Sequence, residues 1–157
     1  MANPSKKRGT DYETRCVNYM REMTGDDRIE RRALHGSKDM GDIYGIFAHG
    51  WEGIGECKAH KVVTPALVTE WREQTVAERE NAGAGFGLLI VNVYRAPIWR
   101  SIVHVTLRDL ARIALPVMVC DGWEARADDA WTCMTLFEAC MHISGRFYDK
   151  DGGFHEQ

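Results

Sequence analysis

The chain has 157 residues, 45% hydrophobic and 27% charged, with a net charge of −3, which is the usual size and composition of one globular domain. No apolar run approaches the roughly 18 residues that span a bilayer, and the opening MANPSKKRGT lacks the apolar core of a signal peptide, so we expect a single cytoplasmic domain over residues 1–157 without a membrane partner. Five cysteines, an odd number without a CxxC pair, exclude a disulfide framework and a common structural zinc site, and we expect them to be buried thiols.

The first part of the chain is expected to hold an arm, a helix and a hairpin. Residues 1–9 are polar and basic without periodicity, and they predict a flexible basic arm. The residues TDYE at 10–13 match a capping box, in which Thr10 and Glu13 close the start of a helix that ends at Gly25. After a polar loop, DIYGIF and IGECKAH predict two strands joined by the turn AHGWEG.

The second part alternates helices and strands. Thr64 and Pro65 mark the start of a helix that runs to about Asn81. FGLLIVNVY is a near-continuous apolar run typical of a central strand, and SIVHVTL predicts another strand. LRDLARIAL predicts a short helix, PVMVC a strand, and DDAWTCMTLFEACMHI an amphipathic helix. This order predicts an α/β fold, a mixed β-sheet flanked by α-helices.

The hairpin places charged residues inside a strand. Because side chains alternate along a strand, Glu56 and Lys58 share one face and Cys57 points to the other. Asp42, at the start of the preceding strand, comes opposite Glu56 if the loop is the three residues 48–50. A slip of one residue would turn Asp42 to the opposite face, so the chemistry depends on this register.

With that register, two carboxylates and an ammonium group meet on one face of the sheet. Adjacent carboxylates repel, and a divalent cation with oxygen ligands relieves the repulsion; Mg²⁺ fits, with Mn²⁺ as a substitute. Lys58 would orient a water molecule, help it lose its proton and attract a phosphate oxygen, which indicates metal-assisted phosphodiester hydrolysis. The alternative is that Asp42 and Glu56 lie in solvent at strand ends and that Lys58 merely pairs with Glu56.

A resemblance to a nuclease superfamily rests on four segments in order: KRGTDYE (7–13), GSKDMGDI (36–43), GECK (55–58) and WREQ (71–74). They resemble the PD-(D/E)xK superfamily, whose fold is restriction-endonuclease-like, and within it the archaeal-type Holliday junction resolvases and their phage-encoded relatives. These proteins share a basic stretch before a helix with an early glutamate, a glycine-serine loop before the aspartate, and an ExK strand. The resemblance covers roughly residues 6–95 and leaves the acidic extension 117–157 unexplained. One departure is Gly41, where the family often has proline.

The resemblance implies roles for the hairpin residues. It makes Asp42 and Glu56 metal ligands, together with the backbone carbonyl of Cys57, and it makes Lys58 the catalytic lysine. Glu13 would be the helix glutamate that approaches the metal, through a water molecule or at a second ion. The capping box is the other interpretation of Glu13, and the two roles are compatible.

Gln74 is a further candidate catalytic residue. Leu67, Trp71 and Gln74 lie at i, i+4 and i+7, so Gln74 shares a helix face with two apolar residues that are expected to pack on the sheet. The resemblance implies that Gln74 faces the active site, while a glutamine at the edge of an apolar stripe is also an ordinary structural feature.

Charge is unevenly spread along the chain. Residues 117–157 hold three basic and eight acidic side chains, a local charge of −5, so residues 1–116 carry +2. The basic side chains either face a polyanion or are scattered surface charge. The candidate DNA-binding residues, with the serine taken from the resemblance, are Lys6, Lys7, Arg8, Arg31, Arg32, Ser37, Lys38 and Lys61.

The resulting prediction is a magnesium-dependent, structure-selective DNA endonuclease. The resemblance implies a Holliday junction resolvase that cuts four-way junctions in branched DNA as a homodimer, in the host cytoplasm if a phage encodes it. Symmetric cuts in a nearly two-fold junction need symmetric subunits, and contacts should be mostly to phosphate. A flap, repair or recombination nuclease keeps the same chemistry, a non-cleaving DNA-binding protein keeps only the fold, and a partner-binding protein would use the acidic segment.

Overall fold

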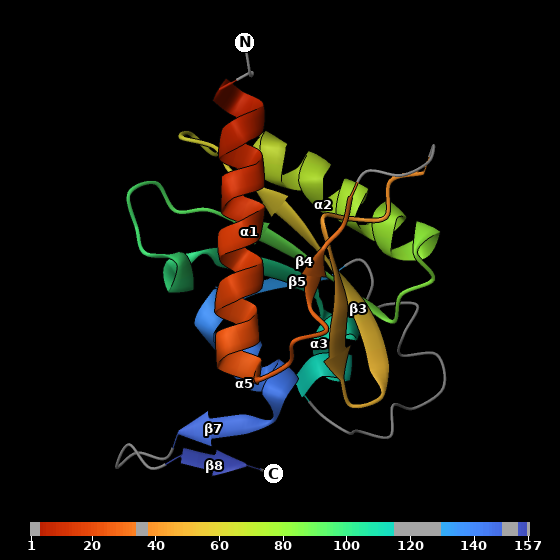
Figure 1. Cartoon of the computed structure of the whole chain (residues 1–157). Coiled ribbons are helices and arrows are strands. Elements are labelled where there is room, and N and C mark those ends of the chain that lie inside the picture. The colour runs from red at the N-terminus through yellow and green to blue at the C-terminus, as the bar shows by residue number, and fades with distance from the viewer. Residues whose placement is uncertain (1–3, 34–37, 115–129, 149–153, 157) are drawn as a thin grey trace.

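The structure, a computed structural model, describes residues 4–33, 38–114, 130–148 and 154–156 (Figure 1). Its elements in chain order are α1 (Pro4–Thr24), β1 (Glu30–Arg31), β2 (Ile43–Ala48), β3 (Trp51–Lys58), α2 (Pro65–Asn81), β4 (Phe86–Val91), the 3₁₀ turn η1 (Ile98–Arg100), β5 (Ile102–Thr106), α3 (Leu107–Ala114), β6 (Trp131–Thr135), α5 (Leu136–Ser144), β7 (Arg146–Tyr148) and β8 (Phe154–Glu156).

The main sheet confirms the predicted mixed α/β architecture. Within the described residues it has six strands in the order β1 to β6, and β7 and β8 form a separate pair. Strands β3 and β4 run parallel, whereas the other neighbours run antiparallel. A parallel pair needs a crossover connection, and α2 provides the one between β3 and β4.

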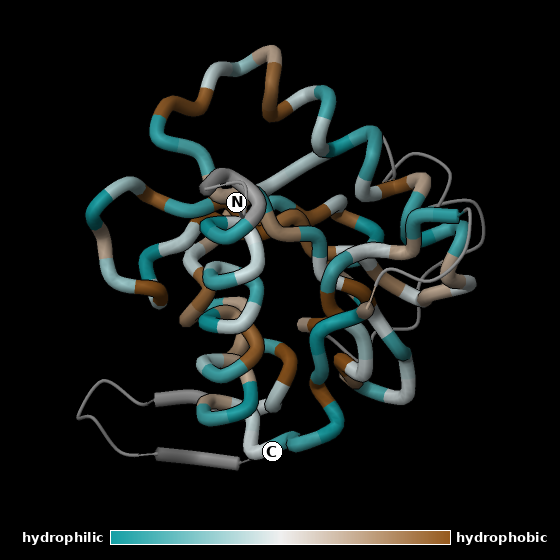
Figure 2. The backbone as a smooth tube through the Cα atoms, turned by 45° about the horizontal axis from the view of Figure 1, so that its top comes forward, coloured by the Kyte–Doolittle hydropathy of each residue, from teal (hydrophilic) through white to brown (hydrophobic). Residues whose placement is uncertain are grey.

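Helices cover both faces of the sheet (Figure 1). The core on one face joins α1, α5 and the sheet, and includes Tyr12, Cys16, Met20, Phe86, Leu88, Ile90, Leu136, Ala139 and Cys140. On the other face, Trp71 of α2 packs against Leu89 and Val91. Along α1 the tube in Figure 2 alternates between hydrophilic and hydrophobic stretches, as expected of a helix with one buried face. No described helix is long and apolar enough to cross a bilayer.

Helix α2 has the predicted bounds. The Thr64 hydroxyl accepts a hydrogen bond from the amide of Leu67 at 3.3 Å, and Pro65 occupies the first helical position. The strands predicted at FGLLIVNVY and SIVHVTL and the helix predicted at LRDLARIAL are confirmed as β4, β5 and α3. The strand predicted at PVMVC lies outside the described residues.

A buried ion pair fixes the far half of α2 against α3. Arg79 Nη1 donates to both carboxylate oxygens of Asp109 at 2.9 Å, and the amide of Gly87 donates to the same carboxylate at 3.0 Å. The pair is almost fully buried, with side-chain exposures of 4% and 2%. Three elements, α2, β4 and α3, are therefore joined beside the face that carries Glu56.

Helix α1 begins earlier than predicted. It starts at Pro4, so residues 4–9 of the predicted flexible arm are helical. Thr10 therefore lies inside the helix, where its carbonyl accepts the hydroxyl of Thr14 at 2.9 Å, and the predicted capping box is wrong. A proline suits the first position of a helix, a signal that the polar composition of residues 1–9 concealed.

The β2–β3 hairpin has a shorter turn than predicted. Ala48 pairs with Trp51, so the turn consists of His49 and Gly50, and the predicted three-residue loop is wrong. Both turn residues have positive φ, 47° and 85°, as two-residue hairpin turns of this kind require.

A β-bulge restores the predicted pairing farther along the hairpin. The pairs on its two sides are Ile46 with Gly53 and Ile43 with Gly55. One extra residue on β2 therefore lies between them. Gly45 occupies the bulge with φ 74°, and a Cβ there would lie 2.1 Å from the carbonyl oxygen of Arg28, so the position requires glycine. Beyond the bulge, Asp42 approaches the part of β3 that carries Glu56.

The helix predicted over DDAWTCMTLFEACMHI is wrong in its first half. Trp131–Thr135 forms β6 at the edge of the sheet, and α5 begins at Leu136. Thr135 and Glu138 form a capping box at this boundary, and aromatic and β-branched residues favour the strand before it. The described part of 117–157 thus supplies an edge strand, a core helix and the separate β7–β8 pair.

Candidate active site

The register of β3 against β4 decides which way the charged motif points. Glu56 lies beside Leu89, and Cys57 lies beside Ile90. Leu89 packs with α2 and Ile90 with the α1 core, so Glu56 points toward α2 and Cys57 points away from it. Lys58, two residues after Glu56, shares the α2 face, as the alternation along the strand predicted.

Glu56 and Lys58 form a close ion pair on that face. Lys58 Nζ lies 2.6 Å from Glu56 Oε1, and the two side chains are 19% and 7% exposed. Burial disfavours the charge on Lys58, but attraction to Glu56, Glu78 and Asp42 raises its pKa above the ordinary value. Lys58 is therefore an ammonium group at neutral pH, a form that attracts phosphate and cannot take up a proton.

Asp42 is held against the same strand. Its Oδ2 accepts a hydrogen bond from the amide of Cys57 at 2.9 Å. Burial and repulsion from Glu56 raise the pKa of Asp42 to about 7, although the hydrogen bond and Lys58 oppose the shift. Gly41 has φ 83°, an angle closed to proline, so the chain enters Asp42 differently from the proline-containing pattern of the resemblance.

A third acid, which the sequence analysis missed, approaches from α2. Glu78 is 5% exposed, and among the described residues its Oε2 is buried without a hydrogen-bond partner. Burial, repulsion from Glu56 and Asp39, and a hydrogen bond with Glu56 raise its pKa to about 9. The available signal was spacing, because Trp71, Thr75 and Glu78 form the buried stripe of α2.

Gln74 is not brought into this cluster. Its Nε2 donates to Glu70 Oε1 at 3.1 Å on the exposed side of α2. Gln74 lies one turn before Glu78, about 40° away around the helix, but its amide is hydrogen-bonded to Glu70, one turn farther back. The prediction for Gln74 started from the buried residue Trp71 and stopped one turn before Glu78, the buried acid of this helix.

Glu13 reaches the cluster from α1. Burial and the charge of Asp42 raise the pKa of Glu13, and Arg31 partly opposes this shift. Glu13 Oε2 lies 3.1 Å from Nε of Arg31. The structure therefore brings Glu13 within electrostatic range of Asp42, and it pairs one of the candidate DNA-binding cations with Glu13.

Cys57, the cysteine in the charged motif, is a poor nucleophile. A hydrogen bond with Cys16 and burial raise the pKa of the Cys57 thiol well above its ordinary value, so its thiolate is disfavoured. Cys16 and Cys140 are buried as predicted, whereas Cys133 is exposed on β6. Cys120 lies outside the described residues.

The acids around Lys58 fit a hard divalent cation. The carbonyl of Lys58 accepts the amide of Asn92 on the β4 side, so the carbonyl of Cys57 faces the opposite side, toward Asp42. Within the described residues no three His, Cys, Asp or Glu side chains are arranged to hold an ion by themselves, so an ion bound here would need a backbone carbonyl or water among its ligands. The crowded carboxyl groups and the unpartnered oxygen of Glu78 are groups that a cation would stabilise.

No protein-family model, curated protein or solved structure matches this chain. Function therefore has to be inferred from the geometry and charge of the cluster. The restriction-endonuclease-like fold and the likeness to junction resolvases stay predictions.

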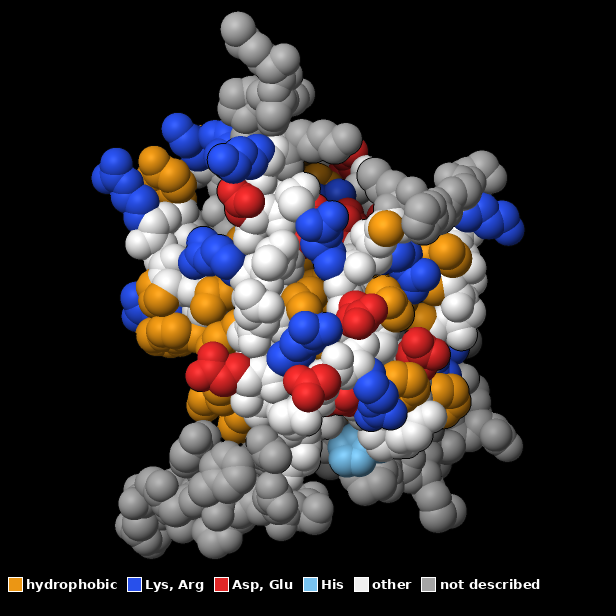
Figure 3. Space-filling model, in the orientation of Figure 1, with side chains coloured by type: hydrophobic (Ala, Val, Ile, Leu, Met, Phe, Trp, Pro, Cys, Tyr) orange, Lys and Arg blue, Asp and Glu red, His pale blue; other side chains and the backbone are white. Residues whose placement is uncertain are grey.

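Several candidate DNA-binding cations are exposed near the N-terminal half of α1. Lys7 and Arg8 are exposed on α1, and Lys61 is exposed in the segment after β3. Figure 3 shows Lys and Arg side chains gathered beside this half of the helix. This surface is locally basic even though the whole chain is acidic.

Three further candidates with described side chains, Lys38, Arg31 and Arg32, come from outside α1. Lys38 is exposed before β2, and Arg31 pairs with Glu13. Arg32 is half-buried, with its guanidinium 5.0 Å from the ring centroid of Tyr44. Ser37 and the side chain of Lys6 lie outside the described residues.

Proposed function

We propose that this protein is a magnesium-dependent, structure-selective DNA endonuclease with a restriction-endonuclease-like fold. The observation that carries the proposal is the convergence of Asp42, Glu56 and Lys58 across two neighbouring strands, with Glu13 and Glu78 beside them. A binding module has no evident use for buried acids that repel one another next to a lysine. An enzyme that recruits a cation to a phosphate does.

The chain's own residues divide the work of hydrolysis. Asp42, Glu56 and the Cys57 carbonyl would hold Mg²⁺, or Mn²⁺ as a substitute. The ion would supply Lewis-acid stabilisation of the phosphate's negative charge. Lys58 retains its proton, so it attracts the phosphate oxygens and stabilises the charge that grows on them during cleavage. Glu56 fixes the position of Lys58 Nζ through their 2.6 Å contact.

The proposed substrate is a four-way DNA junction, cut by a homodimer with two active sites. Two symmetric subunits match the nearly two-fold arrangement of a junction. Lys7, Arg8 and Lys61 would contact phosphates, giving affinity that falls with rising salt and selectivity that depends on DNA shape.

The test compares end-labelled linear duplex, flap and four-way junction with magnesium, using the wild type and Glu56→Gln. We expect paired nicking of the junction by the wild type and a loss of at least about 100-fold in the variant, because an amide is a poor ligand for a hard cation. Circular dichroism would show that the variant is folded. Cleavage of equal rate in both proteins would place the active site elsewhere.

A flap, repair or recombination nuclease is the second candidate. It is favoured by a cavity of about 870 Å³ bordered by Lys58, large enough for a nucleotide. The same set of substrates separates the two, because this enzyme would cut the flap faster than the junction.

A further inference from the structure

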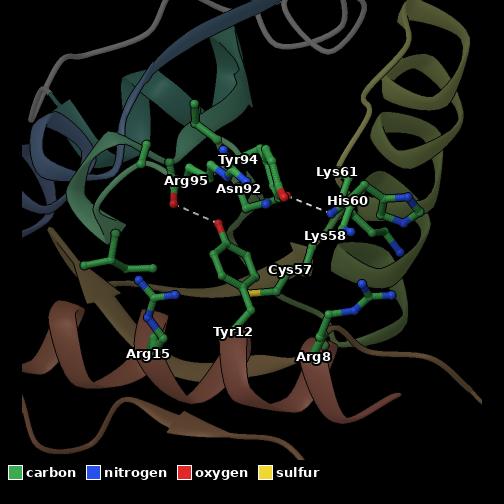
Figure 4. Close-up of a pocket in the computed structure, with 16 residues that line it drawn as sticks. Arg8, Tyr12, Arg15, Cys57, Lys58, His60, Lys61, Asn92, Tyr94 and Arg95 are labelled. Atoms are coloured by element: carbon green, nitrogen blue, oxygen red, sulfur yellow. Dashed lines mark hydrogen bonds between the residues drawn. The ribbon is translucent and has the colours of Figure 1, made fainter. Parts of the chain in front are cut away.

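A pocket opens directly beside Lys58, at the end of the two parallel strands. It lies between the N-terminal half of α1, the residues that follow β3 and the loop that follows β4 (Figure 4). Its volume of about 870 Å³ is in the range of pockets that bind small molecules. Ligands commonly bind at the carboxyl ends of parallel strands, because the loops there can form a crevice.

The lining of the pocket is strongly cationic. It includes Arg8, Arg15, Lys58, Lys61 and Arg95, and none of the described lining residues is an aspartate or glutamate. In a chain with a net charge of −3, this concentration of positive charge is a local feature. The charge of Lys58 is paired with Glu56, and the other four cations suit an anion with more than one negative group.

Helix α1 presents three of the lining residues on one face. Arg8, Tyr12 and Arg15 follow helical spacing, and Figure 4 shows Tyr12 between the two arginines. The Tyr12 hydroxyl donates to Ser101 Oγ at 2.9 Å in a buried hydrogen bond. This bond ties α1 to the residues after η1, so both arginines project from a fixed wall.

The opposite wall carries an exposed aromatic ring. Tyr94 is 49% exposed, with Lys61 Nζ at 5.9 Å and Arg95 Cζ at 5.3 Å from its ring centroid. Arg95 has φ 61°, an uncommon angle for a residue other than glycine, and such strain is often found at binding sites. An aromatic ring among cations is the combination that binds unstacked nucleotides, with the base on the ring and the phosphates on the cations.

We propose that this pocket binds one unstacked nucleotide of the DNA strand next to the cleaved phosphate. Its base stacks on Tyr94, and the flanking phosphates contact Arg8, Arg15 and Arg95. The inference rests on the proposed nuclease function, because Lys58 borders the pocket and contacts Glu56. Within a regular duplex the base faces are covered by their neighbours, so the preferred substrate has an unpaired or distorted nucleotide at a branch point.

Binding measured without metal separates this inference from cleavage. Labelled branched DNA would be titrated in EDTA with the wild type, Tyr94→Ala, Tyr94→Phe and Trp99→Ala. Trp99 is a matched control because it is also exposed, at 43%, and Arg100 lies 5.2 Å from its ring, but it does not line the pocket. We expect Tyr94→Ala to weaken binding about tenfold, with Tyr94→Phe and Trp99→Ala within about twofold of the wild type.

A single abasic site, moved one nucleotide at a time through the branch point, identifies the stacked base. At one position the wild type should lose about tenfold in affinity, and Tyr94→Ala should lose nothing more. The inference would be overturned if Tyr94→Ala bound intact branched DNA as tightly as the wild type. It would also be overturned if the ratio of wild-type to Tyr94→Ala affinity were the same at every abasic position. Wild-type protein that passes this test but fails to cut with magnesium would instead refute the nuclease proposal alone.

Discussion

Asp42 Oδ2 accepts a 2.9 Å hydrogen bond from the amide of Cys57, the residue that lies between Glu56 and Lys58 in the chain. This bond attaches the start of β2 to the end of β3, so the two acids cannot separate without breaking it. The carboxylates remain close despite their repulsion, and the raised pKa of Asp42, about 7, is one consequence of that closeness.

Removing the lysine should affect both catalysis and stability. In Lys58→Met, Glu56 loses its 2.6 Å partner and stays buried beside Asp42 and Glu78. We expect cleavage to fall at least about 100-fold, and the free energy of unfolding to fall by about 1–3 kcal/mol because an unpaired buried charge remains. Urea titration measures the second effect. Lys61→Met, an exposed lysine, is the stability control, and equal losses in both variants would count against a special environment at position 58.

Glu78 and Gln74 give opposite predictions for neighbouring positions on one helix. Glu78 is buried against Glu56, whereas Gln74 bonds to Glu70 on the exposed side. We expect Glu78→Gln to lower kcat/KM about tenfold or more and to raise the magnesium concentration needed for half-maximal cleavage, because an amide cannot ionise and become a carboxylate ligand when the ion binds. Gln74→Ala should stay within about twofold of the wild type. A larger loss of kcat/KM in Gln74→Ala than in Glu78→Gln, measured in a steady-state assay, would show that Gln74 rather than Glu78 acts in cleavage.

Glu78 and Gln74 also show which features of the site could be predicted from the sequence and which could not. Alternation along a strand determines that Glu56 and Lys58 share a face, and the Thr64–Pro65 signal determines where α2 begins, because both are local effects. For Glu78, spacing could suggest a place on the buried stripe with Trp71 and Thr75, but it could not show contact with Glu56. Its burial and its contact with Glu56 come from how α2 rotates against the sheet, and that rotation is set by packing among distant residues.

In the hairpin, too, a neighbour distant in the sequence determined what local counting could not predict. The predicted approach of Asp42 to Glu56 is correct, but the predicted three-residue loop is wrong, and the bulge at Gly45 compensates for the shorter turn. The carbonyl of Arg28 leaves no room for a Cβ at the bulge, and a count along β2 and β3 cannot reveal this neighbour. The pocket beside Lys58 could not be predicted for a similar reason, because its walls come from α1 and two separate loops.

Stability of the metal-free protein should decrease as the pH rises. Asp42 and Glu78 have pKa values of about 7 and about 9, above ordinary values of 3.8 and 4.5. The folded state therefore holds protons that the unfolded state releases. The resulting stabilisation is complete below about pH 4 and is lost as the pH rises through about 7 and then about 9.

Thermal unfolding would measure this effect with and without magnesium. In EDTA we expect the Tm to fall between about pH 6 and about pH 9.5, and magnesium to raise the Tm more at the higher pH, where both acids are ionised and available to it. In Glu78→Gln the part of this fall in Tm that lies nearest pH 9 should be absent, because Gln cannot lose a proton. Magnesium stabilisation that is the same at both pH values would show that these acids do not bind the ion.

The last prediction concerns the bulge that brings Asp42 close to Glu56. Gly45 and Gly50 both have positive φ, 74° and 85°, so replacing either with alanine imposes a similar backbone strain of about 1–2 kcal/mol. Their surroundings differ. A Cβ at position 45 would lie 2.1 Å from the carbonyl oxygen of Arg28, whereas no described atom lies within 4 Å of a Cβ at position 50.

Gly50→Ala should therefore lose only about 1 kcal/mol of stability and should cut DNA like the wild type. Gly45→Ala must displace either β2 or the backbone of Arg28, so we expect a larger loss of stability and at least a tenfold loss of cleavage, as Asp42 moves away from Glu56. Urea unfolding and junction cleavage by the two purified variants make the comparison. Equal costs, with cleavage retained in both, would mean that the placement of Asp42 does not depend on the bulge, and that the amide of Cys57 is sufficient to hold this carboxylate in place.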